Sequence, residues 1–408
     1  SLHDALPICI KKNNKELYFN CINKILISSK ICGILNLSNN QEKYLSTIIN
    51  MINLNEKEEL NEIMIEIIIN LMNFLNENCQ YIKSNWNKIL KIISTLEYYL
   101  LEPEENIILN LKNNHKYKFS EKEIKIFLNK RNNLSLNISD AICESIFIKT
   151  ELFDNEIIII FIQNLCLISK YELDYFYIPR LFSLNKLVEL IHFNLFRPQF
   201  YLKKIWEIIS QYLTEIIIKY NKEKIWKQSL DIIKQIIIKL LEKEEYNKYN
   251  VQEEYFFIFE KILKEIEYNK LNINKLNTKE KAIIDIIYFI ITQYGTKINN
   301  GWKNIFNLIK LFFKMNDTNI NTNIINILKY INNNSKDIFI KNKSEIFENF
   351  IQCLILIYNE KEMKQFAFES LIGIFNEIID ENNLLLKMPL SNKIYELIKV
   401  FFYNIDNL

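Results

Sequence analysis

The side chains best suited to catalysis or metal binding, cysteine and histidine, are scattered along this chain of 408 residues. The cysteines are Cys9, Cys21, Cys32, Cys79, Cys143, Cys166 and Cys353, and the histidines are His3, His115 and His192. No two cysteines are spaced as C-x-x-C, whereas a structural zinc ion needs about four clustered nitrogen or sulfur ligands. Scattered cysteines in a helical chain are most often small buried side chains in a reducing compartment. The sequence therefore predicts no metal ion and no cofactor.

Phosphate-binding loops are also missing from the sequence. With 4 glycines in all, the chain contains neither G-x-x-x-x-G-K-[ST] nor G-x-G-x-x-G. Basic and acidic residues nearly cancel, at 51 against 49, whereas nucleic-acid binding usually needs a basic excess. Lys203 and Lys204 stand beside aromatic residues, but two lysines contribute only about 2 kcal/mol at an anionic membrane surface. We therefore predict no catalytic residues and no nucleic-acid partner.

The distribution of apolar residues indicates an all-α protein. Glycine and proline, at 4 and 5 residues, are too scarce for a β protein rich in tight turns. In "FSLNKLVELIHFNL" the apolar residues recur at helical spacing, and Pro179 and Pro198 stand on either side of this segment. A second such helix follows Pro198 and a third surrounds Trp226. Helices joined by short breaks are expected to form antiparallel pairs.

Three tryptophans have the same apolar neighbours. Trp86, Trp206 and Trp302 each have an apolar residue four positions before and others three and seven positions after. They lie 120 and 96 residues apart, and units of about 40–47 residues are typical of HEAT and armadillo repeats. We therefore predict a HEAT/armadillo-like α-solenoid of stacked antiparallel helix pairs. Each tryptophan is expected near the start of a helix and in the core, and Gly301, which has no Cβ, should let the turn before Trp302 approach a neighbouring helix.

Composition divides the chain into helical and polar segments. Residues 1–9 lack the Asn, Lys and Ile bias of the rest and are interpreted as non-native sequence. The other predicted segments are helical repeats at 10–101, an Asn/Lys-rich disordered insertion at 102–137, helical repeats at 138–267, a loop at 268–280 and helical repeats at 281–408. The longest apolar run, Glu156 to Lys170, is shorter than the roughly 20 residues that span a bilayer. Neither a membrane span nor a signal peptide is expected.

Longer motifs carry a resemblance to a known family. The stretch "YIPRLFSLNKLVELIHFN", followed by "IWEIISQYL", resembles the region downstream of the catalytic domain in the large Arf guanine nucleotide-exchange factors. These are the Sec-seven/BIG, or brefeldin A-inhibited, exchangers. The family pattern P-R-x-F-S-L-x-K-[LMI]-V-E is matched by Pro179, Arg180, Phe182, Ser183, Leu184, Lys186, Val188 and Glu189.

Three further blocks resemble the same family in the same order. The upstream block is matched by Tyr81, Trp86, Ile89, Leu90, Ile93, Ser94, Leu96 and Glu97. A block after Trp226 is matched by Ser229, Leu230, Leu241, Glu242, Lys243, Tyr249, Gln252, Phe259 and Glu260. The last block is "KINNGWKNIF", with Asn300 where the family usually has serine. The structural signature is thus Trp86, Pro179, Phe182, Trp206, Trp226, Gly301 and Trp302, and partner-binding residues are not assigned.

The resemblance implies a function without catalysis in this part of the chain. The family's glutamate-finger motif, F-R-L-P-G-E, does not occur here. The helical segments would be the end of the first, the second and the third downstream homology regions. In the family such regions recruit the exchanger to Golgi membranes, bind activated Arf-family and also Rab GTPases, and control autoinhibition. The implied location is cytoplasmic, peripheral to Golgi and trans-Golgi membranes, with a homodimer formed through other regions.

Two alternatives stay open at the level of sequence. One is a Mon-two-like trafficking scaffold, which lacks the catalytic domain, and the other is an unrelated HEAT-type transport adaptor such as a karyopherin. The F-S-L-x-K wording favours the exchanger over the scaffold. Matches at Lys186, Glu189 and Glu242, interpreted as lying outside the buried faces, argue against the adaptor.

Overall fold

The computed structural model describes most of the chain and divides it into two compact units. The described residues are 15–52, 54, 61–114, 119–243, 252–269, 278–315, 318–334, 338, 344–358, 364–379 and 399. The units are Ser1–Ile209 and Ser210–Leu408. The segment 1–9, interpreted above as non-native, lies outside the described residues.

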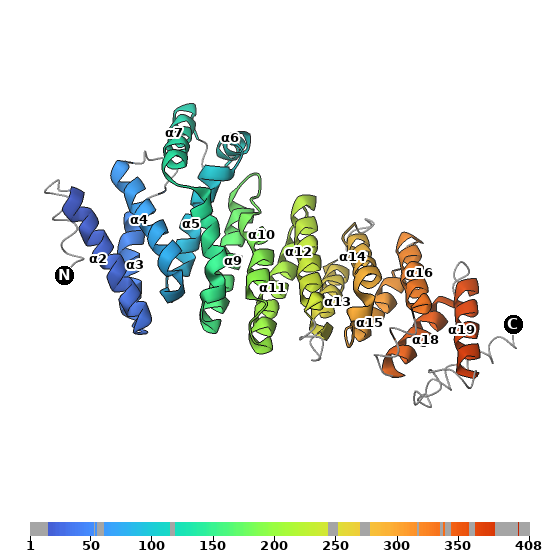
Figure 1. The fold of residues 1–408 in the computed structure, drawn as a ribbon. Coiled ribbons are helices and arrows are strands. Elements are labelled where there is room, and N and C mark those ends of the chain that lie inside the picture. The colour runs from blue at the N-terminus through green and yellow to red at the C-terminus, as the bar shows by residue number, and fades with distance from the viewer. Residues whose placement is uncertain are drawn as a thin grey trace. The chain divides into compact units, whose positions relative to one another are not determined.

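The first unit is built from helices that pack in two layers. These are α2 (Lys15–Ile34), α3 (Ser38–Met51), α4 (Glu62–Asn78), η1 (Cys79–Tyr81), α5 (Trp86–Leu101), α6 (Glu104–Lys112), α7 (Glu121–Asn137), α8 (Asp140–Ile148), η2 (Lys149–Leu152), α9 (Asn155–Tyr175) and α10 (Phe182–Asn194). Helix α4 packs on α2 and α8, and α8 packs on α10, which forms one layer. The second layer contains α5 and α9, which lie side by side (Figure 1).

The second unit repeats this two-layer arrangement. Helix α11 (Gln199–Lys219) crosses the division between the units, and the helices after it are α12 (Glu223–Glu242), α13 (Gln252–Asn269), α14 (Thr278–Tyr294), η4 (Gly295–Lys297), α15 (Trp302–Phe313), α16 (Thr318–Asn333), α18 (Ser344–Tyr358) and α19 (Lys364–Ile379). Helices α12, α14 and α16 stack as one layer, and α13, α15 and α18 stack as the other. No strand occurs in the described residues. The predicted class, an all-α HEAT/armadillo-like solenoid, is confirmed.

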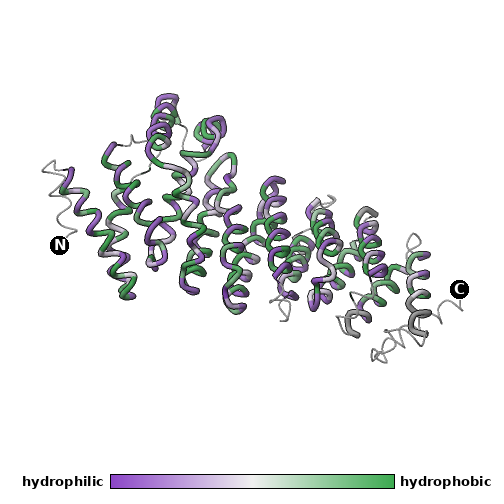
Figure 2. The backbone as a smooth tube through the Cα atoms, viewed as in Figure 1, coloured by the Kyte–Doolittle hydropathy of each residue, from purple (hydrophilic) through white to green (hydrophobic). Residues whose placement is uncertain are grey.

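Each helix has one apolar and one polar face, and the apolar face forms the core. In α12 the residues buried at helical spacing include Trp226, Leu230, Ile233, Ile237 and Leu240. Figure 2 shows hydrophobic and hydrophilic residues alternating along the helices in this way. Burial of these faces is the main stabilising contribution, because a short isolated helix is only marginally stable in water.

The expectation of a disordered insertion at 102–137 is wrong for the described residues. The structure has two helices there, α6 and α7, which protrude beside α5 (Figure 1). Helix α7 begins with a capping box formed by Ser120 and Glu123, and it buries Ile124, Phe127 and Leu134 at helical spacing. The polar composition concealed one apolar stripe, which α7 packs on α5 and α4.

Two smaller expectations also need correction. The loop predicted at 268–280 is wrong at both ends, because α13 continues to Asn269 and α14 begins at Thr278; residues 270–277 lie outside the described residues. Trp86 and Trp302 are the first residues of α5 and α15, as expected, but Trp206 lies two turns inside α11. The shared spacing around the three tryptophans therefore does not describe one local structure.

Two further properties of the described residues bear on function. No helix among them combines the length and apolar character that crossing a membrane requires. The cysteines that the structure describes, all except Cys9, are buried and carry no disulfide.

Candidate functional site

The most diagnostic motif residues of the first unit meet in a buried ionic network. Arg180, in the segment between α9 and α10, donates from Nη1 to Ser94 Oγ (3.1 Å) and from Nη2 to the Ser94 carbonyl (3.0 Å). It also forms an ion pair with Glu97. Its guanidinium carbon lies 4.8 Å from the ring centroid of Tyr98, a distance suited to a cation–π contact. The Arg180 side chain is 2% exposed, so its charge depends on these partners.

Glu172 of α9 completes the network. Its carboxylate accepts hydrogen bonds from Ser94 Oγ (2.6 Å) and from both the backbone N–H (2.9 Å) and Oγ (2.7 Å) of Ser183. Ser183 stands in the first turn of α10, where backbone N–H groups have no partner within the helix and favour a negative charge. Burial raises the pKa of Glu172 and that of Glu97, while the Arg180 guanidinium opposes this rise in both.

A second motif cation is buried beside aromatic rings. Lys186 forms ion pairs with Glu144 and Glu189. Its ammonium also lies 5.5 Å from the ring centroid of Phe147 and 5.6 Å from that of Phe182. Because only 8% of its side chain is exposed, the interpretation of Lys186 as lying outside the buried faces is wrong. Its match to the family pattern therefore reflects packing and charge pairing together.

Two buried glutamines hold the turns that precede Trp86 and Trp302. Gln41 of α3 donates from Nε2 to the Tyr81 carbonyl (2.8 Å), and its Oε1 accepts from the backbone N–H of Lys83 (2.8 Å). Gln41 Nε2 also donates to the Ser29 carbonyl (3.1 Å). We call this two-sided grip on a turn a glutamine clamp.

Gln252 of α13 forms the same clamp in the second unit. Its Nε2 donates to the Lys297 carbonyl (3.0 Å), and its Oε1 accepts from the backbone N–H of Asn299 (2.6 Å). In both turns the indole N–H of the following tryptophan donates to the carbonyl four residues before it, Ile82 (3.1 Å) or Ile298 (3.0 Å). The apolar residue four positions before these tryptophans is thus a turn residue rather than part of a helix face.

Gly301 has a packing role in the second clamp. A Cβ placed on it would lie 2.7 Å from the ring of Phe256 and 3.3 Å from Cβ of Gln252, both on α13. Its φ of −62° is open to any residue, so the need is for space rather than for an unusual backbone. Gly33 is tighter, since its Cβ would lie 1.9 Å from the Tyr81 carbonyl oxygen.

The signature residues are brought together only in part. Trp86 packs against Phe153 and Phe161 of its own unit, with ring centroids 5.2 and 4.9 Å apart. Pro179 and Phe182, on either side of Arg180, are half-buried. Trp206 of α11, Trp226 of α12 and Trp302 of α15 are buried, at 2, 3 and 0% exposure. None of them lines the cavity that opens beside Arg180.

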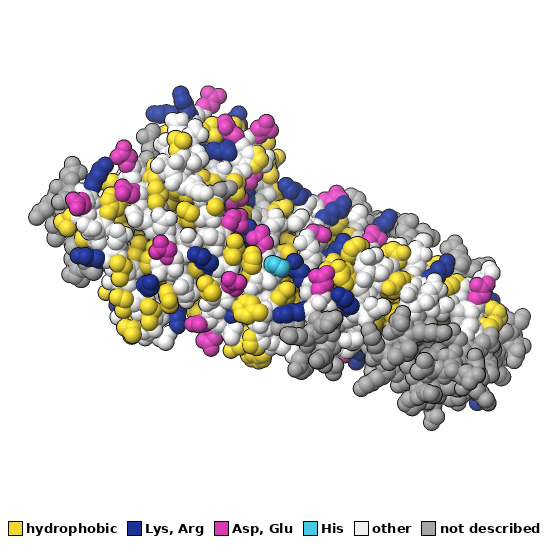
Figure 3. All heavy atoms as spheres, in the orientation of Figure 1, with side chains coloured by type: hydrophobic (Ala, Val, Ile, Leu, Met, Phe, Trp, Pro, Cys, Tyr) yellow, Lys and Arg dark blue, Asp and Glu magenta, His cyan; other side chains and the backbone are white. Residues whose placement is uncertain are grey.

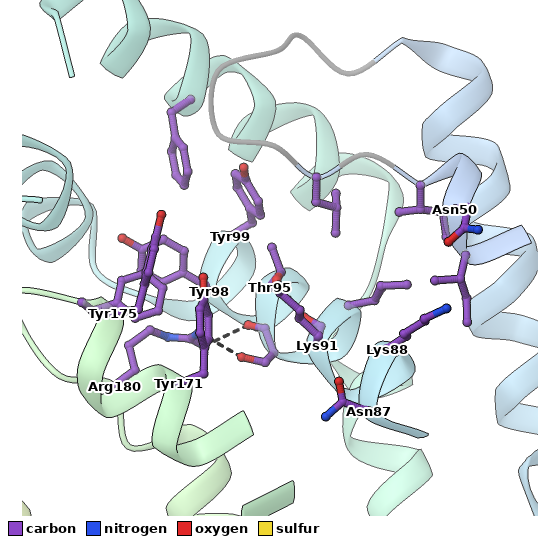
Figure 4. A pocket seen from close by; sticks show the side chains of 17 residues that line it. Asn50, Asn87, Lys88, Lys91, Thr95, Tyr98, Tyr99, Tyr171, Tyr175 and Arg180 are labelled. Atoms are coloured by element: carbon purple, nitrogen blue, oxygen red, sulfur yellow. Dashed lines mark hydrogen bonds between the residues drawn. The ribbon is translucent and has the colours of Figure 1, made fainter. Parts of the chain in front are cut away.

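A cavity of about 530 Å³ opens beside Arg180 in the first unit. We call it the tyrosine cavity, because Tyr98 and Tyr99 of α5 and Tyr171 and Tyr175 of α9 line it. Figure 4 shows Tyr171, Tyr175 and Arg180 on one side and Asn50, Asn87 and Lys88 on the other. This volume lies within the range of about 300–1,000 Å³ of ligand sites in proteins.

The lining suits binding rather than catalysis. Its charged residues are Lys88, Lys91 and Arg180, with aliphatic side chains from α3 and α5 and the ring of Phe127 from α7. Among the residues that the structure describes, no group of three His, Cys, Asp or Glu side chains is placed to hold a metal ion. On the face drawn in Figure 3, basic and acidic side chains are interspersed, in agreement with the near-neutral net charge.

Sequence reasoning missed several of these residues. Glu172 belongs to no quoted motif, and α9 also carries Glu156 and Asp174, so the sequence of the helix does not single Glu172 out. The tyrosine cavity had no signal, because its lining comes from four helices and from the segments after α3 and after α9. Gln252 was part of a motif, but its role depends on a turn 45 residues further along.

Comparisons with known proteins agree with the motifs. Residues 239–330 match the family model described as "Mon2/Sec7/BIG1-like, HDS". The chain is 25% identical over 283 residues to brefeldin A-inhibited guanine nucleotide-exchange protein 4 of Arabidopsis thaliana, covering 66% of this chain and 16% of that protein. It is 23% identical over 330 residues to brefeldin A-inhibited guanine nucleotide-exchange protein 1 of Homo sapiens, covering 74% of this chain and 17% of that protein.

These matches confirm the resemblance to the large exchange factors of the Sec7/BIG family, and this chain is similar to one region of those proteins. The chain spans about one sixth of the length of the relatives it matches, at 16% and 17%. The residues that carry the resemblance are largely the residues of the buried contacts. In the first unit the Ser94 and Glu97 motif meets the Arg180 and Ser183 motif, directly and through Glu172.

The second unit joins its motifs in the same way. Gln252 clamps the turn before Gly301 and Trp302, and Glu260 accepts a hydrogen bond from Asn304 Nδ2 (2.9 Å). Motifs that lie far apart in the sequence therefore contact one another in the folded chain.

Proposed function

We propose that this chain is a non-catalytic regulatory scaffold of an Arf guanine nucleotide-exchange factor that acts in Golgi vesicle-mediated transport. It contributes to membrane recruitment and to GTPase-dependent control of exchange, and Arf-family and also Rab GTPases are its partners. Residues 10–101 are the end of the first downstream homology region, 138–267 the second, and 281–408 the third and beyond.

The observation that best supports this proposal is the pairing of motifs in buried contacts. Arg180, Ser183 and Gln252 match family patterns and hold helices together. Buried contacts of this kind hold neighbouring helices in fixed positions. Stacked helical repeats held in this way form an extended surface on which partner proteins bind. Relatives named as brefeldin A-inhibited exchange proteins supply the class of partner.

A pull-down with purified chain tests the proposal. We expect immobilised chain to retain Arf loaded with a non-hydrolysable GTP analogue and to release Arf loaded with GDP. The chain alone should leave the rate of GDP release from Arf unchanged, measured with a fluorescent nucleotide. Equal retention of both Arf forms, or retention of neither, would contradict GTPase-dependent regulation.

The two alternatives give different results. A Mon-two-like scaffold is favoured if the intact transcript upstream encodes further helical repeats without an F-R-L-P-G-E domain. A karyopherin-type adaptor is favoured if the chain retains GTP-loaded Ran and ignores GTP-loaded Arf.

A further inference from the structure

The tyrosine cavity combines two chemical features that a ligand would have to match. Its walls are aromatic and aliphatic, and its rim carries positive charge from Lys88 and Lys91 of α5 (Figure 4). Among the residues that the structure describes, no acidic side chain is part of the lining. The guanidinium of Arg180 is already paired with Glu97 and Glu172, so Lys88 and Lys91 are the cations of the lining that a ligand could pair with.

The two lysines are available to a ligand. Both are exposed, and neither forms an ion pair with a residue that the structure describes. Lys88 Nζ donates to Ser46 Oγ at 3.3 Å, and Lys91 Nζ lies 5.1 Å from the ring centroid of Tyr171. Both partners, Ser46 and Tyr171, are uncharged. A ligand carboxylate can therefore replace them with a stronger, charge-assisted hydrogen bond to each lysine.

The aromatic wall suits a protein side chain. The rings of Tyr171 and Tyr175 are stacked, with centroids 4.9 Å apart and planes 21° apart, and Tyr171 is 37% exposed. A stacked pair presents a rigid amphipathic surface, and tyrosine is enriched where proteins bind one another for that reason. Arg180, which lies at the base of this wall, keeps its buried Nε–H without an acceptor in the structure.

We infer that the tyrosine cavity binds an acidic peptide segment of a partner protein, with an aromatic or aliphatic residue of that segment filling the cavity and its carboxylates meeting Lys88 and Lys91. The inference deepens the proposed function, because it names the chemistry of one partner. A lipid headgroup fits less well. Two lysines attract an anionic headgroup weakly, and the apolar wall would remain unfilled.

Selection from a random short-peptide library displayed on phage tests the inference with the full chain as bait. The selected peptides, synthesised with a fluorophore, are expected to be rich in Asp and Glu around one Phe, Trp or Leu. Their affinity should fall about tenfold or more in Lys88→Glu/Lys91→Glu, because attraction at two sites becomes repulsion. Lys88→Arg/Lys91→Arg should retain binding, and Tyr171→Ala should weaken it.

The matched control is Lys43→Glu/Lys261→Glu, which makes the same charge change at exposed helix positions outside the cavity. This control should bind the peptides with an affinity within about twofold of that of the parent chain. The parent chain should bind the peptides more weakly at high salt, because salt screens the attraction between exposed charges. The inference is overturned if the selected peptides lack acidic residues. It is also overturned if Lys88→Glu/Lys91→Glu and Lys43→Glu/Lys261→Glu lower the peptide affinity equally.

A vesicle arm distinguishes the other source of negative charge. Vesicles containing phosphatidylserine and a phosphoinositide replace the peptide as probe. If Lys88→Glu/Lys91→Glu abolishes vesicle binding and leaves the peptides unaffected, the cavity is a headgroup site and the peptide inference is wrong.

The Arf pull-down on the same variants separates this inference from the proposed function. Loss of the peptides with retained GTP-loaded Arf supports the cavity as a site for another partner. Failure of the parent chain to retain Arf, with the peptides behaving as expected, rejects the proposed GTPase partner and leaves the cavity inference intact.

Discussion

Gln41 and Gln252 occupy equivalent positions in the two units of the chain. Each lies in the first turn of a helix and binds two backbone groups of a turn, a carbonyl and an N–H that are separated by one residue. The helix after that turn begins with a tryptophan. The clamp satisfies backbone groups that a helix start would otherwise leave without partners. Two such modules in one chain indicate a structural repeat beneath a weak sequence similarity.

Removing the clamp should destabilise the second unit. In Gln252→Leu the Lys297 carbonyl and the Asn299 N–H lose their partner. Because an unsatisfied buried group costs about 1–3 kcal/mol and these two groups are part-buried, we expect a loss of about 1–3 kcal/mol in the free energy of unfolding. Urea unfolding followed by tryptophan fluorescence measures this. Gln365→Leu, at an exposed position of α19, is the control and should change stability by less than about 0.5 kcal/mol.

Gly301 and Gly373 give a matched pair of substitutions. Alanine at 301 would place its Cβ against Phe256, and overpacking of this kind costs about 1–3 kcal/mol. Alanine at 373 would meet nothing within 4 Å, and in a helix interior it should stabilise by about 0.5–1 kcal/mol. Thermal unfolding of the two variants should therefore shift in opposite directions. A parallel shift would contradict the close approach at Gly301.

Arg180→Met should be the most damaging single change in the first unit. It leaves Glu97 and Glu172 buried without their cation, and removing one partner of a buried ion pair costs about 3–5 kcal/mol. Urea unfolding gives the value, with Arg131→Met as the control. Arg131 is half-buried on α7, and its replacement should cost less than about 0.5 kcal/mol. Equal effects of the two variants would mean that the network does not stabilise the fold.

The same network predicts a pH dependence. Burial raises the pKa of Glu172, so the folded chain binds more protons than the unfolded chain between the unfolded pKa, about 4.3, and the folded pKa. Its contribution to stability therefore falls as pH rises through that window. Without the opposing Arg180 cation the folded pKa rises further. The deficit of Arg180→Met should then shrink from about pH 8 to about pH 5, measured by urea unfolding at each pH, and a deficit that grows would contradict this sign.

The buried cysteines should report on folding. Burial raises the pKa of Cys166 and of Cys353 to about 12 in each case. Since the thiolate is the reactive form, both should resist iodoacetamide near neutral pH in the folded chain and react in urea. Mass spectrometry of the labelled peptides shows the difference. Labelling of Cys166 at the same rate in both conditions would contradict its burial.

The sequence predicted the helices better than the contacts between them. Apolar spacing in α12 identified its buried face, because the face depends on one helix alone. The same reasoning failed for α7, where Asn and Lys outweigh a stripe of only a few apolar residues in the composition. The role of Arg180 depends on partners 83 and 86 residues away. No spacing rule could place those partners, although the family motifs singled out the residues themselves.

The distance in sequence between Arg180 and Ser94 has a consequence for how the first unit unfolds. In most stacked-repeat proteins each repeat contacts only its neighbours, so the ends can fray while the middle stays intact. Here the Arg180 hydrogen bond to Ser94 and the Arg180 ion pair with Glu97 join α5 to the segment after α9, which packs beside α5 although α6, α7 and α8 separate the two in sequence. Opening either end therefore breaks a contact of the other. The segment from Trp86 to Asn194 should lose its structure in a single cooperative step, with hydrogen-exchange protection that is uniform along it.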